Sequence, residues 1–99
     1  MFALVVRFDL HDEEAARGFD ALVAQTTPLI TSQEPGTLVY AVHEVEDAPL
    51  SRVFYELYAS REAFEQHESE PHVRHFLTEL EQHLADRQVT FLSSPSGKV

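Results

Sequence analysis

TLVYAVHEVEDAPLSRVFYELYA, residues 37–59, lies at the centre of the chain and contains two runs typical of β-strands. Residues 37–45 and 52–59 are rich in β-branched and aromatic side chains, which favour extended backbone. Only the loop 46–51 separates them, so we expect the two strands to pair as an antiparallel hairpin. The rest of the fold can be read outward from this hairpin.

A strand and a helix are expected before the hairpin. Residues 2–10 (FALVVRFDL) are apolar on one face and mostly apolar on the other, which indicates a strand covered on both sides. Acidic residues 12–14 favour the start of a helix, and apolar residues recur at helical spacing after them. Pro28 lacks a backbone N–H, so we expect a kink or a stop near Thr27. Glu34-Pro35-Gly36 then turns the chain.

Two helical segments and a last strand are expected after the hairpin. Ser60 is a suitable N-cap for a short helix ending at His67. Pro71 suits the first turn of a further helix, whose apolar stripe extends to Leu84. Residues 88–93 (QVTFLS) predict a shorter fourth strand.

The element order is therefore β-α-β-β-α-β, with the second helical region in two pieces. This order predicts an α+β, ferredoxin-like fold with a four-stranded antiparallel sheet and both helical regions on one face. We expect a single domain over residues 1–93 and a flexible C-terminal tail over residues 94–99. The helix-free sheet face would still carry apolar side chains, and two copies packed sheet on sheet would bury them in a homodimer. Those side chains include Val39, Ala41, Val53, Tyr55 and Leu57.

The composition excludes several classes of protein. The 99 residues carry 17 acidic and 7 basic side chains, a net charge of −10, which disfavours binding to nucleic acid or to anionic membranes. No apolar run is long enough to span a membrane. The absence of cysteine excludes disulfides and thiolate chemistry and is compatible with a cytoplasmic location, which we expect. The partners expected are small molecules and a second copy of the chain.

Chemistry must come from a few polar residues. His67 and His72 lie on either side of a predicted helix break, where a neutral imidazole can act as a base; alternatively they cap helix ends or bind backbone groups. Glu56 would be a buried carboxylate with a raised pKa, unless it belongs to a structural ion pair. Tyr58 would be a core aromatic with a polar end. Arg7 projects into a partly enclosed site or pairs with an acid at the sheet margin.

The six histidines do not indicate a metal site. No two of them stand one helical turn apart on a common face with a third ligand, as zinc or iron would require. We therefore expect neither a metal nor any other cofactor. The six are His11, His43, His67, His72, His75 and His83.

Four segments resemble the antibiotic biosynthesis monooxygenase family. They are EPGTLVY (34–40), FYELY (54–58), SREAFEQH (60–67) and PHVRHF (71–76). The resemblance implies a dimeric α/β-barrel with a pocket between sheet and helices in each subunit. Glu56 matches the family's strand glutamate, His67 its helix-end histidine and His72 the histidine of its Pro-His pair. Tyr58 stands where many members have tryptophan.

The family contains cofactor-free oxygenases of quinols and anthrones, haem-degrading oxygenases and an isomerase. The chain has neither asparagine nor tryptophan, and Arg7 stands about where the haem degraders have their asparagine. These departures disfavour haem degradation and remove part of the usual anthrone-oxidising apparatus.

We therefore expect a cofactor-independent monooxygenase that oxidises a quinol-like or polyketide aromatic with O2. His67 or His72 would be the base, and Arg7 and Tyr58 would stabilise the oxyanion. An isomerase or lyase of a small hydroxy-carbonyl compound, or a non-catalytic binding dimer, remain the alternatives. The expected pocket walls are Phe2, Tyr40, Phe54, Phe64 and Phe76.

Overall fold

A computed structural model describes residues 1–99 and contains one four-stranded sheet. Its strands are β1 (Phe2–Leu10), β2 (Thr37–Val45), β3 (Ala48–Tyr58) and β4 (Leu84–Leu92), in the order β2-β3-β1-β4. Every neighbouring pair is antiparallel. The predicted sheet is confirmed.

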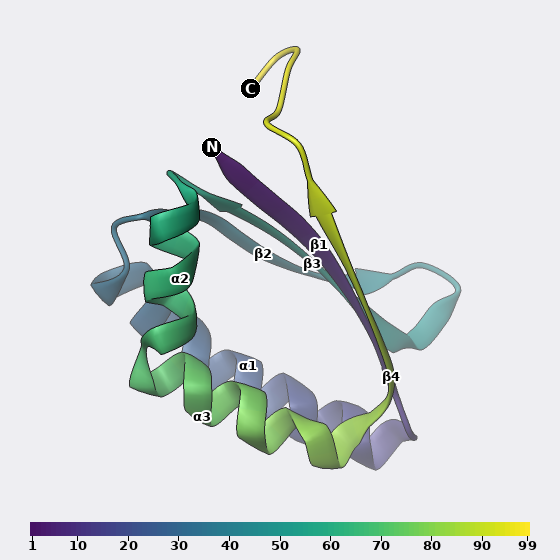
Figure 1. The fold of residues 1–99 in the computed structure, drawn as a ribbon. Coiled ribbons are helices and arrows are strands. Elements are labelled where there is room, and N and C mark those ends of the chain that lie inside the picture. Colours follow the sequence, from purple (N-terminus) through teal and green to yellow (C-terminus); the bar gives the residue numbers. More distant parts are fainter.

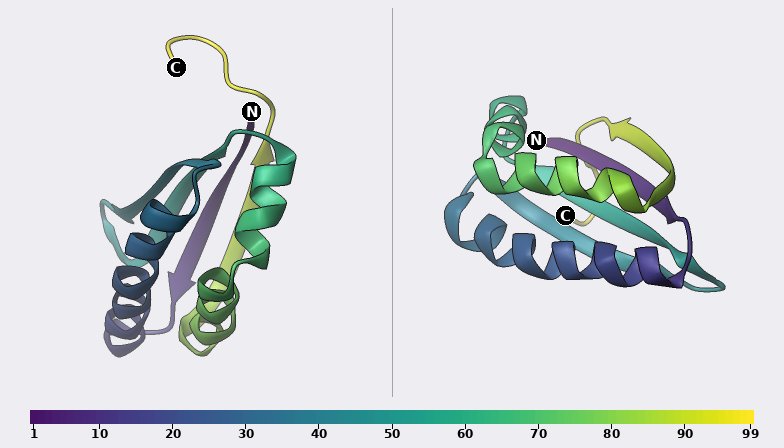
Figure 2. Two further views of the ribbon diagram at one scale, coloured as in Figure 1. Left: turned by 90° about the vertical axis from the view of Figure 1, so that its left-hand side faces the viewer. Right: turned by 90° about the horizontal axis from the view of Figure 1, so that it is seen from below.

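The helices all lie on one face of this sheet (Figure 1 and Figure 2). They are α1 (Glu13–Gln33), α2 (Arg61–Ser69) and α3 (Pro71–Glu79), followed by the short 3₁₀ helix η1 (Leu80–His83). The α+β, ferredoxin-like class is therefore confirmed. No helix is both long and apolar enough to cross a membrane.

The helix caps follow from the local sequence. The Asp12 carboxylate accepts a hydrogen bond from the Ala15 N–H at the start of α1, and the Ser60 hydroxyl accepts one from the Ala63 N–H at the start of α2. Pro71 occupies the first turn of α3. Each residue satisfies, or does without, a backbone donor that has no partner inside the helix.

Of the two expectations near Thr27, a kink or a stop, the stop is wrong, because α1 continues through Pro28 to Gln33. Buried side chains stand on both sides of Pro28, namely Thr26 and Ile30, and the Thr26 hydroxyl donates to the Leu22 carbonyl. Packing of this face holds the helix together although the proline removes one backbone hydrogen bond.

Two strand boundaries also differ from the prediction. The hairpin loop is only the turn Glu46–Asp47, and β3 already begins at Ala48. Asp47 adopts a φ of 64°, a left-handed conformation that aspartate tolerates better than most residues and that permits a tight turn. Strands β2 and β3 thus pair from Val45 and Ala48 onward, although the side chains of residues 46–51 are typical of a loop.

The last strand begins at Leu84 rather than at residue 88, and α3 ends at Glu79 rather than near Leu84. Leu84 follows Leu80 by four residues, the spacing expected of a helix, so the sequence predicts a helix that is longer than the one observed. Pairing with β1 reaches back to Leu10, across a register shift next to Asp9, and draws these residues into the sheet. Backbone pairing overrides the local pattern here.

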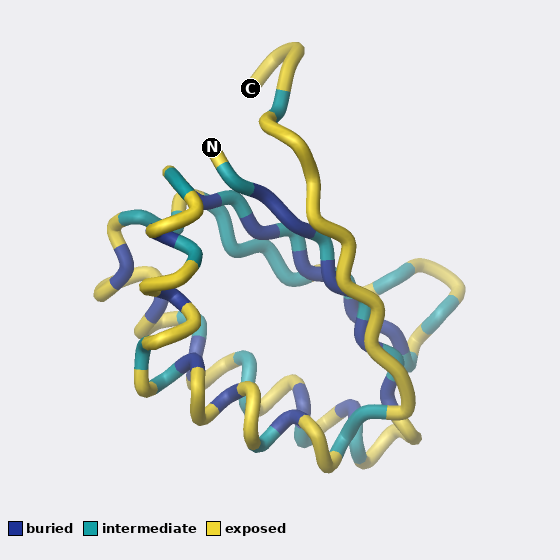
Figure 3. Tube along the Cα trace, viewed as in Figure 1, coloured by how far each residue is buried: buried dark blue, intermediate teal, exposed yellow.

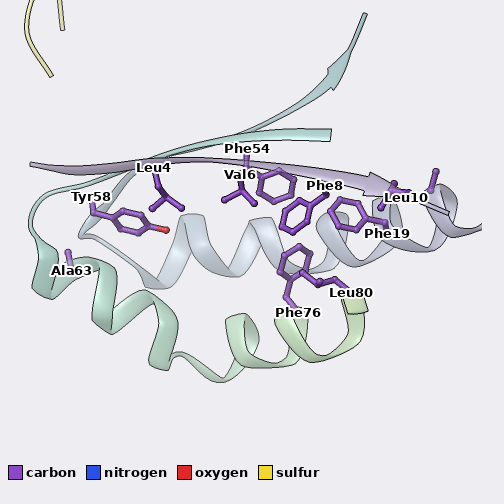
Figure 4. Packing of buried hydrophobic residues seen from close by; sticks show 11 residues of the cluster. Leu4, Val6, Phe8, Leu10, Phe19, Phe54, Tyr58, Ala63, Phe76 and Leu80 are labelled. Atoms are coloured by element: carbon purple, nitrogen blue, oxygen red, sulfur yellow. The ribbon is translucent and has the colours of Figure 1, made fainter. Parts of the chain in front are cut away.

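The core lies between β1, β3 and the helices, as the buried segments in Figure 3 show. Phe8, Phe19, Phe54 and Phe76 pack together with ring centroids 5.1–6.2 Å apart. Figure 4 shows Tyr58 at the opposite end of the cluster, with Leu4 and Val6 between it and these rings. The core is therefore dominated by aromatic side chains at one end and has a polar group, the tyrosine hydroxyl, near the other.

Candidate active site

A cavity of about 300 Å³ opens between the sheet and the helices α2 and α3. Eleven of its 15 lining residues are hydrophobic, which suits an apolar, aromatic ligand. The lining consists of Leu4, Val6, Phe8, Tyr40, Phe54, Glu56, Phe64, His67, Glu68, Val73, Phe76, Leu77, Arg87, Val89 and Phe91.

The carboxyl group of Glu56 is the buried acid of this cavity. Only 6% of the residue is exposed, and the Tyr58 hydroxyl donates a hydrogen bond to Glu56 Oε1 over 2.5 Å. Glu56 and Tyr58 are two residues apart on β3, so both side chains point toward the helices. Burial raises the pKa of Glu56 to about 7, against the opposing effect of the Tyr58 hydrogen bond. Glu56 can therefore exchange a proton near neutral pH.

His67 faces this acid across the end of the cavity. Its Nε2 lies 3.9 Å from Glu56 Oε1, and its Nδ1 lies 2.6 Å from Glu34 Oε1. A carboxylate only accepts hydrogen bonds, so Nδ1 carries the proton that binds Glu34. In the neutral ring, Nε2 is then an unprotonated acceptor on the side of Glu56. This is the nitrogen that can act as a base.

Glu34 binds a second histidine as well. His72 Nε2 donates to Glu34 Oε2 over 2.5 Å, and the Thr37 hydroxyl donates to Oε1 over 2.7 Å. Glu34 is 7% exposed, and the side chains of both histidines are buried. Three donors thus surround one buried carboxylate and fix the orientation of the His67 ring.

The close approach of α2 to the turn after α1 places His67 beside Glu34. A Cβ on Gly36 would lie 2.7 Å from the Ala63 Cβ, so only glycine allows this packing without a shift. His67 follows Ala63 by one helical turn and occupies the same buried face of α2. Figure 1 shows α2 beside the turn that joins α1 to β2.

Tyr40 on β2 covers the same end of the cavity. Its ring lies 5.6 Å from that of His67 and 5.6 Å from that of Phe54, centroid to centroid. Burial, and then the negative charges of Glu56 and Glu34, raise the pKa of Tyr40 well above its ordinary value. Its hydroxyl therefore stays protonated and can only donate or accept hydrogen bonds.

The structure brings most of the predicted site residues together. Glu56 and His67 line the cavity. Tyr58 and His72 do not line it: the Tyr58 hydroxyl binds Glu56, and the His72 ring binds Glu34, the partner of His67. The predicted walls Tyr40, Phe54, Phe64 and Phe76 all line it. Phe2 does not, and instead packs against the wall residues Phe64 and Phe91 with centroid separations of 4.9 and 5.8 Å.

Arg7 lies on the other side of the sheet, so the expectation that it enters the cavity is wrong. Its Nε donates to Asp9 Oδ1 over 3.1 Å and its Nη2 donates to the Ser51 hydroxyl over 3.0 Å. The reason is strand parity: odd-numbered residues of β1 face away from the helices, whereas Leu4, Val6 and Phe8 face them. Arg7 instead pairs with an acid, Asp9, which was the alternative prediction for this residue.

Sequence reasoning missed three polar residues of the site: Glu34, Glu68 and Arg87. Glu34 precedes a Pro-Gly turn and stands 33 residues from His67, so nothing local marks it as a partner. Arg87 was outside the predicted strand, but in β4 it points into the cavity, pairs with Glu81 and lies 5.9 Å from the centroid of Phe8. No group of three or more His, Cys, Asp or Glu side chains is placed to hold a metal ion.

Comparison with known proteins agrees with this architecture. Residues 1–90 match the family model described as antibiotic biosynthesis monooxygenase. No curated protein matches the chain significantly.

Solved structures of similar proteins share the fold over nearly the whole chain. A protein from Mycobacterium tuberculosis is 28% identical with a TM-score of 0.84, covering 99% of this chain and 98% of its own. A proposed antibiotic biosynthesis monooxygenase from Caulobacter crescentus has a TM-score of 0.88 at 19% identity, covering 96% of this chain and 90% of its own. A third, from Deinococcus radiodurans, has a TM-score of 0.81 at 22% identity, covering 100% of this chain and 97% of its own. At these identities the last two similarities concern the fold alone.

Proposed function

Because the chain belongs to the antibiotic biosynthesis monooxygenase family, we propose that it oxidises a quinol-like or polyketide aromatic with O2, without a cofactor. The observation that supports this most is the position of His67. Its Nε2 faces Glu56 at the end of a cavity whose other walls are mainly aromatic and aliphatic. A flat ring bound there would present a hydroxyl group to one base and one acid.

The reaction begins with removal of a proton. His67 Nε2 takes the proton of a phenolic hydroxyl, and the resulting phenolate is electron-rich enough to reduce O2 itself. A new carbon–oxygen bond forms as the ring passes electrons to O2, giving a peroxide. His67 returns its proton to the peroxide, and the C–H bond at the same carbon then breaks as the O–O bond breaks. One oxygen stays on carbon as a carbonyl, and the other leaves as hydroxide, which the released proton converts to water. For a hydroquinone the balance is hydroquinone plus O2 to hydroxyquinone plus water.

Glu56 takes the role that Arg7 was expected to have. With a pKa of about 7 it is partly protonated at neutral pH, and the protonated form can donate a hydrogen bond to the phenolate oxygen. Tyr58 supports it, because its hydroxyl holds Glu56 Oε1 and keeps the carboxyl group directed toward the cavity. The apolar walls exclude water and strengthen both interactions.

A homodimer through the helix-free sheet face belongs to the same proposal. Val39, Ala41, Val53, Tyr55 and Leu57 are all half-buried on that face of the single chain. A second copy would cover them and give the dimeric α/β-barrel expected from the family resemblance. We further propose residues 1–93 as the domain and residues 94–99 as its tail.

The acid and base at one end of the cavity also suit a second candidate, an isomerase. An acid and a base on facing elements can move a proton between neighbouring carbons of a hydroxy-carbonyl compound. The two candidates differ in their need for O2, because isomerisation proceeds under anaerobic conditions.

Oxygen consumption tests the proposal. The metal-stripped protein is mixed with naphthohydroquinones and anthrones in an oxygen electrode, and product formation is followed by absorbance with and without O2. We expect turnover that requires O2 and falls at least about 100-fold in His67→Gln, the usual contribution of a general base.

His75→Gln is the matched control, because His75 is an exposed histidine of α3. It should keep the wild-type rate. Equal rates in His67→Gln and the wild-type protein would remove His67 as the base, and anaerobic turnover of a hydroxy-ketone would favour the isomerase.

A further inference from the structure

His67 separates two cavities of opposite character. Besides the large apolar cavity, a small one of about 40 Å³ lies on the outer side of the histidine, and only one of its nine lining residues is hydrophobic. His67 is the only residue that lines both. The small cavity is lined by Gln33, Glu34, Pro35, Gly36, Thr37, Ala63, Gln66, His67 and Glu70.

The two nitrogens of the His67 ring are directed to opposite sides of this wall. Nε2 faces Glu56, which lines the apolar cavity, and Nδ1 binds Glu34, which lines the polar one. A proton taken up at Nε2 can therefore be matched by a proton released at Nδ1, on the far side of the ring.

The polar cavity has room for water. A water molecule needs about 10–15 Å³ of cavity volume and two to four polar partners. The 40 Å³ available is about three to four times this minimum, and Glu34, Gln66 and Glu70 supply polar groups. The buried carboxylate of Glu34 is thus next to a space that suits water.

We propose that Glu34 and the polar cavity behind it form a proton outlet for His67, separate from the route by which substrate enters. The inference rests on the proposed function. As Nε2 takes the substrate's hydroxyl proton, the Nδ1 proton passes to Glu34 Oε1 and then to water. One O–H bond of the substrate breaks and one forms in hydronium, while Glu34 ends ionised. Nε2 later returns its proton to the peroxide oxygen, and Nδ1 is reprotonated by the reverse path.

An outlet at the back solves a problem that a dry cavity creates. Water is excluded while the aromatic substrate fills the apolar cavity, so until the peroxide forms the doubly protonated His67 ring cannot release a proton to solvent on that side. His72 has a positioning role, since its Nε2–H holds Glu34 Oε2 and leaves Oε1 to His67. The arrangement moves a proton out without opening the apolar cavity.

Proton exchange measured on the wild-type protein tests this outlet without relying on turnover. The exchange of the His67 Nδ1–H with water is followed by ¹⁵N NMR, with the apolar cavity empty and then saturated with 2-naphthol. We expect the exchange rate to stay within about twofold, because the ligand does not cover the outlet. A slowing of tenfold or more would show that protons pass through the apolar cavity and would overturn the inference.

Glu34 variants test the same path in turnover. Glu34→Gln keeps the size and one acceptor but cannot take a proton, so kcat should fall at least about tenfold while 2-naphthol affinity stays unchanged. In Glu34→Ala, formate should restore activity and the isosteric but non-basic formamide should not. Equal rescue by both, or a wild-type kcat in Glu34→Gln, would reduce Glu34 to a structural residue.

The outcomes separate the two proposals. Failure of 2-naphthol to bind, together with no O2-dependent oxidation by the wild-type protein, would sink the proposed function and the outlet with it. Binding and oxidation in the wild-type protein, with ligand-blocked exchange, would sink the outlet alone.

Discussion

Glu56 shows how one residue's surroundings define its chemistry. A glutamate on an exposed strand would be ionised at neutral pH, but here burial raises the pKa to about 7. The Tyr58 hydroxyl, which opposes this rise, has its own pKa raised by burial and by the charge of Glu56. The pair therefore keeps a proton that can be donated inside an apolar cavity.

The raised pKa of Glu56 predicts a pH-dependent stability. The unfolded chain ionises at the ordinary value of 4.5, whereas the folded chain holds its proton up to about pH 7. Between these values the folded state binds more protons, so the free energy of unfolding should decrease as the pH rises. A shift of this size corresponds to about 3 kcal/mol.

Glu56→Gln should remove this dependence, since the amide does not ionise. Urea unfolding of both proteins at pH 4.5, 6 and 8 measures it. The variant should gain stability relative to the wild-type protein as the pH rises, by about 3 kcal/mol in total. A constant difference across this range would contradict the assignment.

At the scale of the element, packing of α2 on the turn after α1 creates the polar end of the site. Ser60 starts the helix, Gly36 lets it approach and His67 follows on the same face. The contact between Gly36 and Ala63 is thus required for the contact between His67 and Glu34. A substitution that disturbs the Gly36–Ala63 contact should therefore also disturb the His67–Glu34 hydrogen bond.

Gly36→Ala should destabilise the protein by about 1–3 kcal/mol, the usual effect of overpacking a close contact. The added methyl group would stand 2.7 Å from the Ala63 Cβ and push α2 outward. In a double-mutant cycle with Ala63→Gly, which removes the clashing carbon, thermal unfolding should reveal a favourable coupling. Additive effects would show that this contact does not set the position of α2.

At the scale of the whole molecule, the helices cover one sheet face and leave the other open (Figure 2). Arg7, Asp9 and Ser51 form a polar cluster at one end of the open face, and the Ser51 hydroxyl donates to Asp9 Oδ1 over 2.5 Å. That hydrogen bond, more than the Arg7 guanidinium, lowers the pKa of Asp9. The middle of the open face carries Val5, Val39, Ala41, Val53, Tyr55 and Leu57, with polar side chains such as His43, Gln88 and Thr90 toward its edges. This apolar area is the physical reason to expect a second subunit there.

Tyr55→Glu should convert the proposed homodimer into a monomer. Tyr55 lies in the middle of the open face, opposite Val5 on one neighbouring strand and Ala41 on the other, so a glutamate there would bury an unpaired negative charge in the interface. Analytical ultracentrifugation measures the change in mass. Ala24→Glu, on the exposed side of α1, is the control and should leave the mass unchanged. A wild-type protein that sediments as a monomer would remove the dimer from the proposal.

The amino-acid sequence alone determined the order of elements, the antiparallel sheet and four of the cavity's wall residues, Tyr40, Phe54, Phe64 and Phe76. These depend on alternation, helical spacing and caps, which act between residues close in sequence. It also indicated Glu56, which shares a strand face with Phe54 and Tyr58, and His67, which stands at a predicted helix break.

Only the tertiary structure decided which polar side chains of the site contact one another and where strand β4 begins. Glu34 meets His67 and His72 because a turn, a glycine and two helices converge, and β4 extends back to Leu84 because β1 is there to pair with it. Arg7 was assigned to the wrong side because an almost wholly apolar strand does not reveal which face the helices cover. Contacts between distant segments depend on packing, and local patterns carry no record of them.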